Sequence, residues 1–237
     1  MATKNDFISG LKKHKIKKPV LDAFEAVNRA KFFDPFFKNK LYLPDEPIPI
    51  GYGEMSDPLL SLLQMLNHLA PKRSARVLEV GTGSGYSTAL LAHLVDEVAT
   101  VEHNEKLALG AKDTLAANKI DNVRIFVGDG TDPRSNLGIF DAIIIFGACK
   151  IRPLRLIQCL KKGGSMVFPM GPIIRQQIAL VVNDLMVDDV QLYKTKFHEF
   201  CVFPPLRGMF GTDFEGFPNL SEEVLPGVEK PSGKEQP

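Results

Sequence analysis

Short apolar runs alternate with longer amphipathic ones from Arg76 onward. This pattern is typical of a mostly parallel sheet covered by helices on both faces. The predicted strands are Arg76–Val80, Glu97–Val101, Val123–Val127, Phe140–Phe146 and Gly164–Phe168. The predicted helices between them are Ser87–Val95, Glu105–Asn118 and Arg152–Leu160. The fold class is therefore predicted as α/β, doubly wound around a mostly parallel, Rossmann-like sheet.

The pattern changes beyond Gln176, where strand-like stretches follow one another without clear helices. They are Gln176–Val182, Val190–Leu192 and Glu199–Phe203. We expect them to add antiparallel strands to the C-terminal edge of the sheet. The glycine pair at 163–164 predicts the end of a helix and the direct start of a strand.

The two ends of the chain differ from its middle. Residues 11–18, LKKHKIKK, hold five lysines and a histidine, and they form either the solvated face of an N-terminal helix or a contact to phosphate or RNA. Residues 221–237 are rich in Glu, Lys, Pro and Gly and almost lack large apolar side chains. We therefore divide the chain into a basic segment at 1–22, one domain with an N-terminal helical cover at 23–210, and an extension at 211–237 that we expect to be mobile.

Composition limits the class of protein and its cellular compartment, but it does not indicate the reaction. The chain has 237 residues, 44% of them hydrophobic, and a net charge of +1, as ordinary globular proteins do, with no global attraction to nucleic acid. Its three cysteines match neither a disulfide framework nor a zinc site, which favours a reducing, cytoplasmic compartment. No apolar stretch approaches the roughly 20 residues that span a bilayer. We expect a monomer without a metal and without a membrane partner.

The most informative motif is VLEVGTGSGYSTALL, residues 77–91, in which a strand leads through glycines into a helix. The free N–H groups of the helix N-terminus and the missing side chains let a ligand approach the backbone. The spacing is G-x-G-x-G rather than the dinucleotide pattern G-x-G-x-x-G. Glu79, just before the turn, suits a cation or an amine better than a pyrophosphate. The predicted ligand-binding residues of this turn are Gly81, Thr82, Gly83, Ser84, Gly85 and Tyr86.

Two further acids follow the next strands. Glu102 ends the second strand, 17 residues after Gly85, where a carboxylate can accept hydrogen bonds from ribose hydroxyls. Asp129 and Gly130 follow the third strand. Because parallel strands end at the same sheet edge, the acids would surround one crevice. Alternatives stay open: Glu79 is either a ligand residue or a cap of backbone groups, Glu102 is either a ligand residue or a solvated strand end, and Asp129 either binds or holds a turn. Tyr86 either lines the pocket or only packs, and His103 either lies near the ligand or has a plain surface role.

The combination resembles a class I S-adenosylmethionine-dependent methyltransferase. More specifically, the chain resembles the protein-L-isoaspartate O-methyltransferase family from about Phe24 to Gly208. The segments that carry this resemblance are AFEAVNRAKFF (23–33), IPIGYGEMSDP (48–58), VLEVGTGSGYSTALLAHLV (77–95), VGDG (127–130), FDAIIIFGAC (140–149), QCLKKGGSMVFPMGP (158–172) and FCVFPPLRG (200–208). The resemblance implies S-adenosylmethionine as donor, S-adenosylhomocysteine as product, and repair of damaged proteins by methylation of the free carboxylate of isoaspartyl residues.

This chemistry needs no general base, because a carboxylate is already ionised near pH 7. The site must instead exclude water and hold one carboxylate oxygen while the other attacks. The family places a serine before an x-Pro pair for this purpose, and Ser56 is its match. Ser56 could equally be the N-cap of the helix that starts near Pro58.

The same loop departs from the family pattern. GYGEMSDP is one residue shorter, with Glu54 in place of a glutamine and an additional acid at Asp57. Either carboxylate would repel a carboxylate substrate, and Lys150 at the end of the fourth strand is a candidate to offset them. Two alternatives therefore remain: a methyltransferase with a different acceptor, and a cofactor-binding protein without turnover.

Overall fold

The computed structural model describes residues 3–132, 137–187 and 190–212, so nearly all of the extension predicted at 211–237 lies outside the described residues. Its α-helices are α1 (Lys4–Leu11), α2 (Lys18–Ala26), α3 (Leu59–Leu69), α4 (Tyr86–Leu94), α5 (Glu105–Ala117) and α6 (Leu154–Ile157). Three 3₁₀ turns are η1 (Lys12–His14), η2 (Arg29–Phe32) and η3 (Pro35–Phe37). The main-sheet strands are β3 (Arg76–Val80), β4 (Glu97–Glu102), β5 (Val123–Val127), β6 (Phe140–Ile145), β7 (Leu160–Met170), β8 (Gln176–Val187) and β9 (Val190–Cys201).

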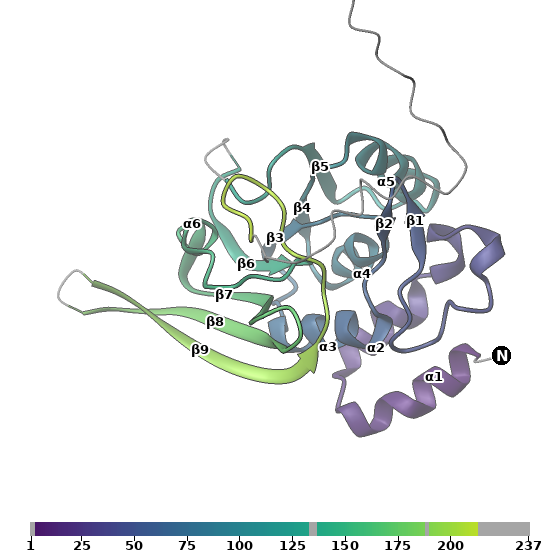
Figure 1. Cartoon of the computed structure of the whole chain (residues 1–237), viewed down its shortest axis with the longest axis horizontal. Coiled ribbons are helices and arrows are strands. Elements are labelled where there is room, and N and C mark those ends of the chain that lie inside the picture. Colours follow the sequence, from purple (N-terminus) through teal and green to yellow (C-terminus); the bar gives the residue numbers. More distant parts are fainter. Residues whose placement is uncertain (1–2, 133–136, 188–189, 213–237) are drawn as a thin grey trace, which may run out of the picture.

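The seven strands form one sheet in the order β5-β4-β3-β6-β7-β8-β9. Neighbouring strands from β5 to β7 pair in parallel, whereas β8 and β9 add as antiparallel strands. Figure 1 shows the β8–β9 hairpin as a long twisted ribbon that extends away from the helices. This confirms the predicted class of fold: α/β, doubly wound and mostly parallel, with an antiparallel C-terminal edge.

Side chains of the central strands point alternately to the two faces of the sheet, and each face packs in its own hydrophobic cluster. On β3, Val77 belongs to the cluster that includes residues of α1 to α5, while Leu78 and Val80 face the opposite cluster. That opposite face is covered by Leu156 and Ile157 of α6 and by residues near the C-terminal end of the described chain. Because side chains alternate along a strand, Glu79 points to the same side as Val77, toward the helices.

The predicted helix at 152–160 is much shorter in the structure. It spans only Leu154–Ile157, because the amide of Phe140 already bonds the carbonyl of Cys159 at 2.8 Å and Leu160 pairs with Phe140. The chain therefore joins the sheet before the two glycines, which lie within β7 next to a register irregularity. The two short strands predicted after Val190 are likewise one continuous strand, β9.

The lysine-rich segment is not a helix face. α1 ends at Leu11, and Lys15 adopts a left-handed conformation with φ 51° between η1 and α2. Leu11 and Ile16 are buried in the main core, and the lysines around them are exposed. This part of the sequence thus turns the chain between two helices and anchors it with its apolar residues.

Two observations bear on the predicted compartment. None of the helices within the described ranges is long and apolar enough to cross a membrane. Cys149, Cys159 and Cys201 are free, and burial raises the pKa of Cys149 and Cys201 to about 12, which keeps these thiols protonated and unreactive. The cytoplasmic location and the monomeric state stay predictions.

Candidate active site

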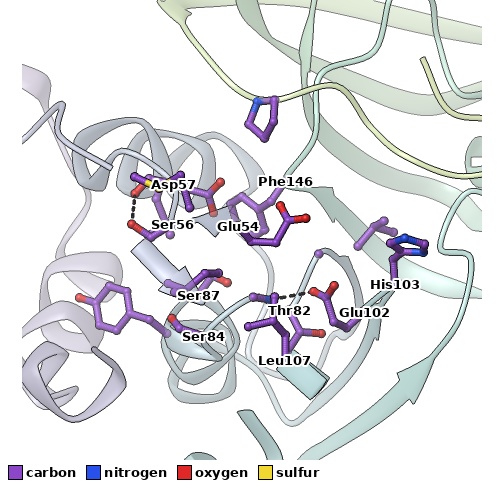
Figure 2. A pocket seen from close by; sticks show the side chains of 18 of the residues that line it. Glu54, Ser56, Asp57, Thr82, Ser84, Ser87, Glu102, His103, Leu107 and Phe146 are labelled. Atoms are coloured by element: carbon purple, nitrogen blue, oxygen red, sulfur yellow. Dashed lines mark hydrogen bonds between the residues drawn. The ribbon is translucent and has the colours of Figure 1, made fainter. Parts of the chain in front are cut away.

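A cavity lies at the carboxyl ends of β3, β4 and β6, where a parallel sheet of this type binds ligands (Figure 2). Its walls come from the glycine turn after β3, from a small hairpin of β1 (Pro49–Gly51) and β2 (Glu54–Met55), and from residues 204–207. The polar and charged side chains that line it are Arg29, Glu54, Ser56, Asp57, Thr82, Ser84, Tyr86, Ser87, Glu102, His103 and Arg207.

The turn has the backbone conformation that its glycines allow. Gly81, Gly83 and Gly85 all have positive φ, at 96°, 53° and 83°. A Cβ at Gly83 would lie 3.3 Å from Cδ1 of Ile50, so the hairpin packs directly on the bare backbone. Gly85 is the N-cap of α4 and supplies no side-chain bond, so the first amides of the helix stay available to a ligand.

Glu102 is held in one orientation at the end of β4. Its Oε2 accepts a bond from the amide of Gly83 at 2.9 Å, and its Oε1 accepts one from the amide of Asn104 at 2.9 Å. Figure 2 shows the carboxylate directed into the cavity beside the turn. Each oxygen can accept a further bond, so the group is preorganised for two adjacent hydroxyls.

Glu79 lies beneath the turn and is fully buried. Its Oε2 accepts bonds from the hydroxyls of Thr88 at 2.5 Å and Thr100 at 2.6 Å, and Thr82 in turn bonds Thr100 at 2.7 Å. Its Oε1 has no partner in the described part of the chain. Burial raises the pKa of Glu79 to about 7, with the threonine hydrogen bonds acting against it. The acid therefore secures the turn and leaves one oxygen unsatisfied.

The carboxyl of Asp57 lines the cavity together with those of Glu54 and Glu102. Burial and the nearby charge of Glu79 raise the pKa of Asp57 to about 8, while Arg29 lowers it. The Arg29 guanidinium is itself buried, with the rings of Phe33 and Tyr86 each 4.6 Å away. Burial lowers the Arg29 pKa and raises that of Tyr86 to about 12. With three acids around it, the cavity suits a positively charged ligand.

Ser56 joins the two ends of the loop that carries the hairpin. Its hydroxyl oxygen accepts a bond from the amide of Ile48 at 3.0 Å and donates a long one to the carbonyl of Asp57 at 3.3 Å. The capping alternative is wrong, since α3 has Pro58 as its N-cap and no side-chain bond there. Ser56 instead shapes the loop and lines the cavity.

Glu54, which stands where the family pattern has a glutamine, forms an ion pair. Glu54 accepts a bond from Nη1 of Arg207 at 2.5 Å, although the two residues lie 153 positions apart. Arg207, not Lys150, offsets this charge, since Lys150 does not line the cavity. Sequence reasoning missed Arg207 and Arg29 as site residues, although both stand inside segments that carry the family resemblance.

Comparison with known proteins identifies the family. A sequence model of the protein-L-isoaspartate (D-aspartate) O-methyltransferase family matches residues 2–207. The chain belongs to this family. It is 42% identical over 167 residues to the protein-L-isoaspartate O-methyltransferase of Pectobacterium atrosepticum, covering 69% of this chain and 77% of the relative. It is 39% identical over 194 residues to that of Petrotoga mobilis, covering 81% and 88%.

Solved structures show the same fold at lower identity. One from Plasmodium falciparum, assigned to the same activity and solved with S-adenosyl-L-homocysteine, has a TM-score of 0.69 at 21% identity and covers 85% of this chain and 96% of its own. Another, a protein-L-isoaspartate O-methyltransferase, has a TM-score of 0.69 at 22% identity and covers 84% and 65%. This chain is thus an isoaspartate methyltransferase-like enzyme by sequence and by fold.

The site residues predicted from the sequence fall into two groups. Those that line the cavity are Ser56, Gly81, Thr82, Gly83, Ser84, Tyr86, Glu102, His103 and Gly130. Glu79, Gly85 and Asp129 support the cavity from outside its lining. Asp129 accepts bonds from Thr131 and, at 2.6 Å, from the amide of Met209. Asp129 therefore holds a turn, as the alternative had it, and also ties down the C-terminal segment.

Proposed function

We propose that this chain transfers the methyl group of S-adenosylmethionine to the free carboxylate of L-isoaspartyl residues in proteins and releases S-adenosylhomocysteine. The observation that carries the proposal is the acid-rich cavity at the glycine turn, with Glu102 preorganised at the end of β4. Membership of the isoaspartate methyltransferase family and the bound product in a structure of the same fold support it.

The cavity fits this donor on its own chemistry. Glu102 accepts hydrogen bonds from the two ribose hydroxyls, and the glycine turn lets the donor lie against the backbone. The unsatisfied Oε1 of Glu79 and the carboxyl of Asp57 supply negative charge toward its positive groups. When bound, S-adenosylmethionine supplies a methyl group activated by a cationic sulfur.

The acceptor side needs positioning rather than proton removal. The long Ser56 bond to the Asp57 carbonyl can exchange for a bond to one oxygen of the substrate carboxylate, while Ser56 still accepts the Ile48 amide. Arg207 neutralises Glu54 at the mouth of the cavity, which removes the repulsion expected from this acid. The substrate carboxylate then meets the Ser56 hydroxyl as a donor and no unpaired charge from Glu54.

A second candidate is methyl transfer to another acceptor. The observation in its favour is Asp57, a carboxyl inside the cavity at the residue that follows Ser56. A neutral or basic acceptor would tolerate this acid better than a carboxylate does. The family to which the chain belongs favours the isoaspartyl acceptor instead.

The test is a methyl-acceptor assay with an isoaspartyl peptide and its normal aspartyl twin. We expect label from the donor in a base-labile ester that releases methanol, and only with the isoaspartyl peptide. Ser56→Ala should lower kcat by roughly tenfold or more, as loss of an anion-stabilising donor does, and Ser74→Ala, at an exposed loop position, should not. Donor binding without ester formation, together with label on other molecules of a cell extract, would favour the second candidate.

A further inference from the structure

A group of metal-ligating side chains lies apart from the cavity. His68, in the last turn of α3, meets His198 and Glu199 of β9, and one ligand atom from each of the three lies within 4.8 Å of the others. None of them lines the cavity described above. Figure 1 shows α3 beside the base of the β8–β9 hairpin.

The backbone of β9 explains why two consecutive side chains face the same helix. Side chains on a regular strand alternate between faces. The pairing of β8 with β9 shifts register between Gln177 opposite Phe200 and Ala179 opposite Phe197, so His198 and Glu199 together face a single residue. Such a bulge redirects side chains. The side-chain amide of Gln177 also bonds the His198 carbonyl at 3.0 Å, which holds the bulge in place.

The three side chains are already arranged against one another. Nε2 of His68 lies 2.7 Å from Oε2 of Glu199, and the rings of His68 and His198 stack with centroids 3.7 Å apart. Nε2 of His198 is buried and has no hydrogen-bond partner among the described residues. A buried ring nitrogen without a hydrogen-bond partner destabilises the fold unless a water molecule or an ion binds to it.

We propose that His68, His198 and Glu199 form a zinc site that joins the end of α3 to the bulge in β9. Two imidazoles and one carboxylate are a ligand set typical of Zn²⁺ with three protein ligands and water in the fourth position. The ion takes the place of the hydrogen bond between His68 and Glu199, whose proton moves to the other ring nitrogen or to solvent. At His198 the charge of Glu199 acts against that of Lys196.

Zinc binding requires the two imidazole rings to leave their stacked arrangement. Tetrahedral Zn²⁺ with bonds of about 2.0–2.1 Å separates its ligand atoms by roughly 3.3 Å, so one ring must rotate until both ring planes meet at the ion. The side chain of Glu199 is 43% exposed, which leaves a path for the ion from solvent. The site goes beyond methyl transfer, and its proposed role is to fix the hairpin to the helical layer.

Calorimetric titration of tag-free, chelator-treated protein with Zn²⁺ tests the proposal. We expect one ion per chain and a melting temperature that rises with zinc concentration. His68→Gln and His198→Gln should each weaken binding by at least about tenfold. His93→Gln, which changes an exposed histidine on α4, is the matched control and should bind as the unmodified protein does. Equal affinity in all three variants, or no binding by the unmodified protein, would overturn the site.

A second measurement needs no variant, in case the histidine substitutions impair folding. Co²⁺ bound by nitrogen and oxygen ligands shows visible d–d absorption without a thiolate charge-transfer band. We expect that spectrum at one equivalent, removed by competing Zn²⁺. A thiolate band would assign the ion to a cysteine, and the proposed site would then be wrong.

Discussion

Asp57, Glu79 and Glu102 place three carboxyl groups around one cavity, with Arg29 as a cation that acts on Asp57. Each acid has a separate task in the proposed reaction, since Glu102 binds hydroxyls, Glu79 secures the turn and Asp57 faces the donor. Because burial and like charges disfavour ionisation, Asp57 and Glu79 are not both ionised in the ligand-free protein near neutral pH. Proton binding and ligand binding are therefore coupled at this site.

The coupling predicts an unusual pH dependence of stability. The pKa values of Asp57 and Glu79 rise on folding, from 3.8 to about 8 and from 4.5 to about 7. Between these values the folded state holds protons that the unfolded state has lost, so the free energy of unfolding falls as pH rises, most steeply from about 5 to 7, and it levels off above about 8. Asp57→Asn should flatten this slope in denaturant titrations, and Asp113→Asn, at an exposed position on α5, should not.

Ligand binding should show the opposite trend. A cationic donor favours the ionised acids, so its affinity should strengthen as pH rises through 7 to 8. If the free energy of unfolding varies with pH in the same way for the unmodified protein and Asp57→Asn, the raised pKa assigned to Asp57 is wrong.

Glu102→Ala should remove donor binding. The substitution deletes two acceptors for the ribose hydroxyls and frees the amides of Gly83 and Asn104, which Glu102 now satisfies. With about 1.5–3 kcal/mol for each hydrogen bond to a charged group, affinity should fall by roughly a hundredfold or more. Calorimetric titration with S-adenosylhomocysteine measures this affinity, and Glu105→Ala, at an exposed position of α5, is the control. Unchanged affinity would place the ribose elsewhere.

At the scale of elements, the cavity is closed by two segments far apart in sequence. The β1–β2 hairpin contributes Glu54, and the chain after β9 contributes Arg207. The second segment is also fastened at Ala148, whose amide bonds the Pro204 carbonyl at 2.7 Å and whose carbonyl accepts the Leu206 amide at 2.9 Å. The ion pair thus lies between a hairpin packed on the glycine turn and a strand-like segment docked beside β6.

Arg207→Ala should raise KM for the isoaspartyl peptide. It leaves Glu54 unpaired beside an anionic substrate, and a repulsion of about 1 kcal/mol corresponds to roughly a fivefold change. Adding Glu54→Gln should restore much of the loss, whereas Lys150→Ala, outside the cavity lining, should leave KM unchanged. If the double variant is no better than Arg207→Ala alone, the guanidinium binds substrate directly instead of neutralising Glu54.

Sequence patterns predicted the elements that burial dictates. β3 has the predicted bounds, because it is a buried strand in the middle of a parallel sheet, and β5 also has them, although it is an edge strand with largely exposed side chains. The helix predicted at 152–160 was too long, because pairing with β6 captures Leu160 and no local signal reveals that. The contact of Arg207 with Glu54 depends on where two loops, distant in sequence, meet in the fold. The residue types and sequence positions of Arg207 and Glu54 could not reveal it.

At the scale of the whole molecule, the N-terminal segment belongs to the core. Phe7, Leu11 and Ile16 are buried in the same cluster as α3 and α4, and the Phe7 ring lies 5.5 Å from that of Phe24. The amide of Lys17 bonds Oδ1 of Asn67 on α3 at 2.8 Å. The division predicted from the sequence at residue 22 separates residues that share this packing. Truncation tests whether residues 1–22 are a separate segment or part of the domain core.

Removing residues 1–16 should destabilise the whole domain. Loss of three buried apolar side chains, at roughly 1.5–3 kcal/mol each as an upper bound, is comparable with the total stability of a typical domain, about 5–15 kcal/mol. Thermal and denaturant unfolding measure the loss, and Phe7→Ala should give a smaller effect in the same direction if the truncated protein aggregates. Removing residues 221–237, which the sequence predicts to be mobile, is the matched control. An unchanged melting temperature after the N-terminal truncation would mean that residues 1–16 cover the domain without stabilising it.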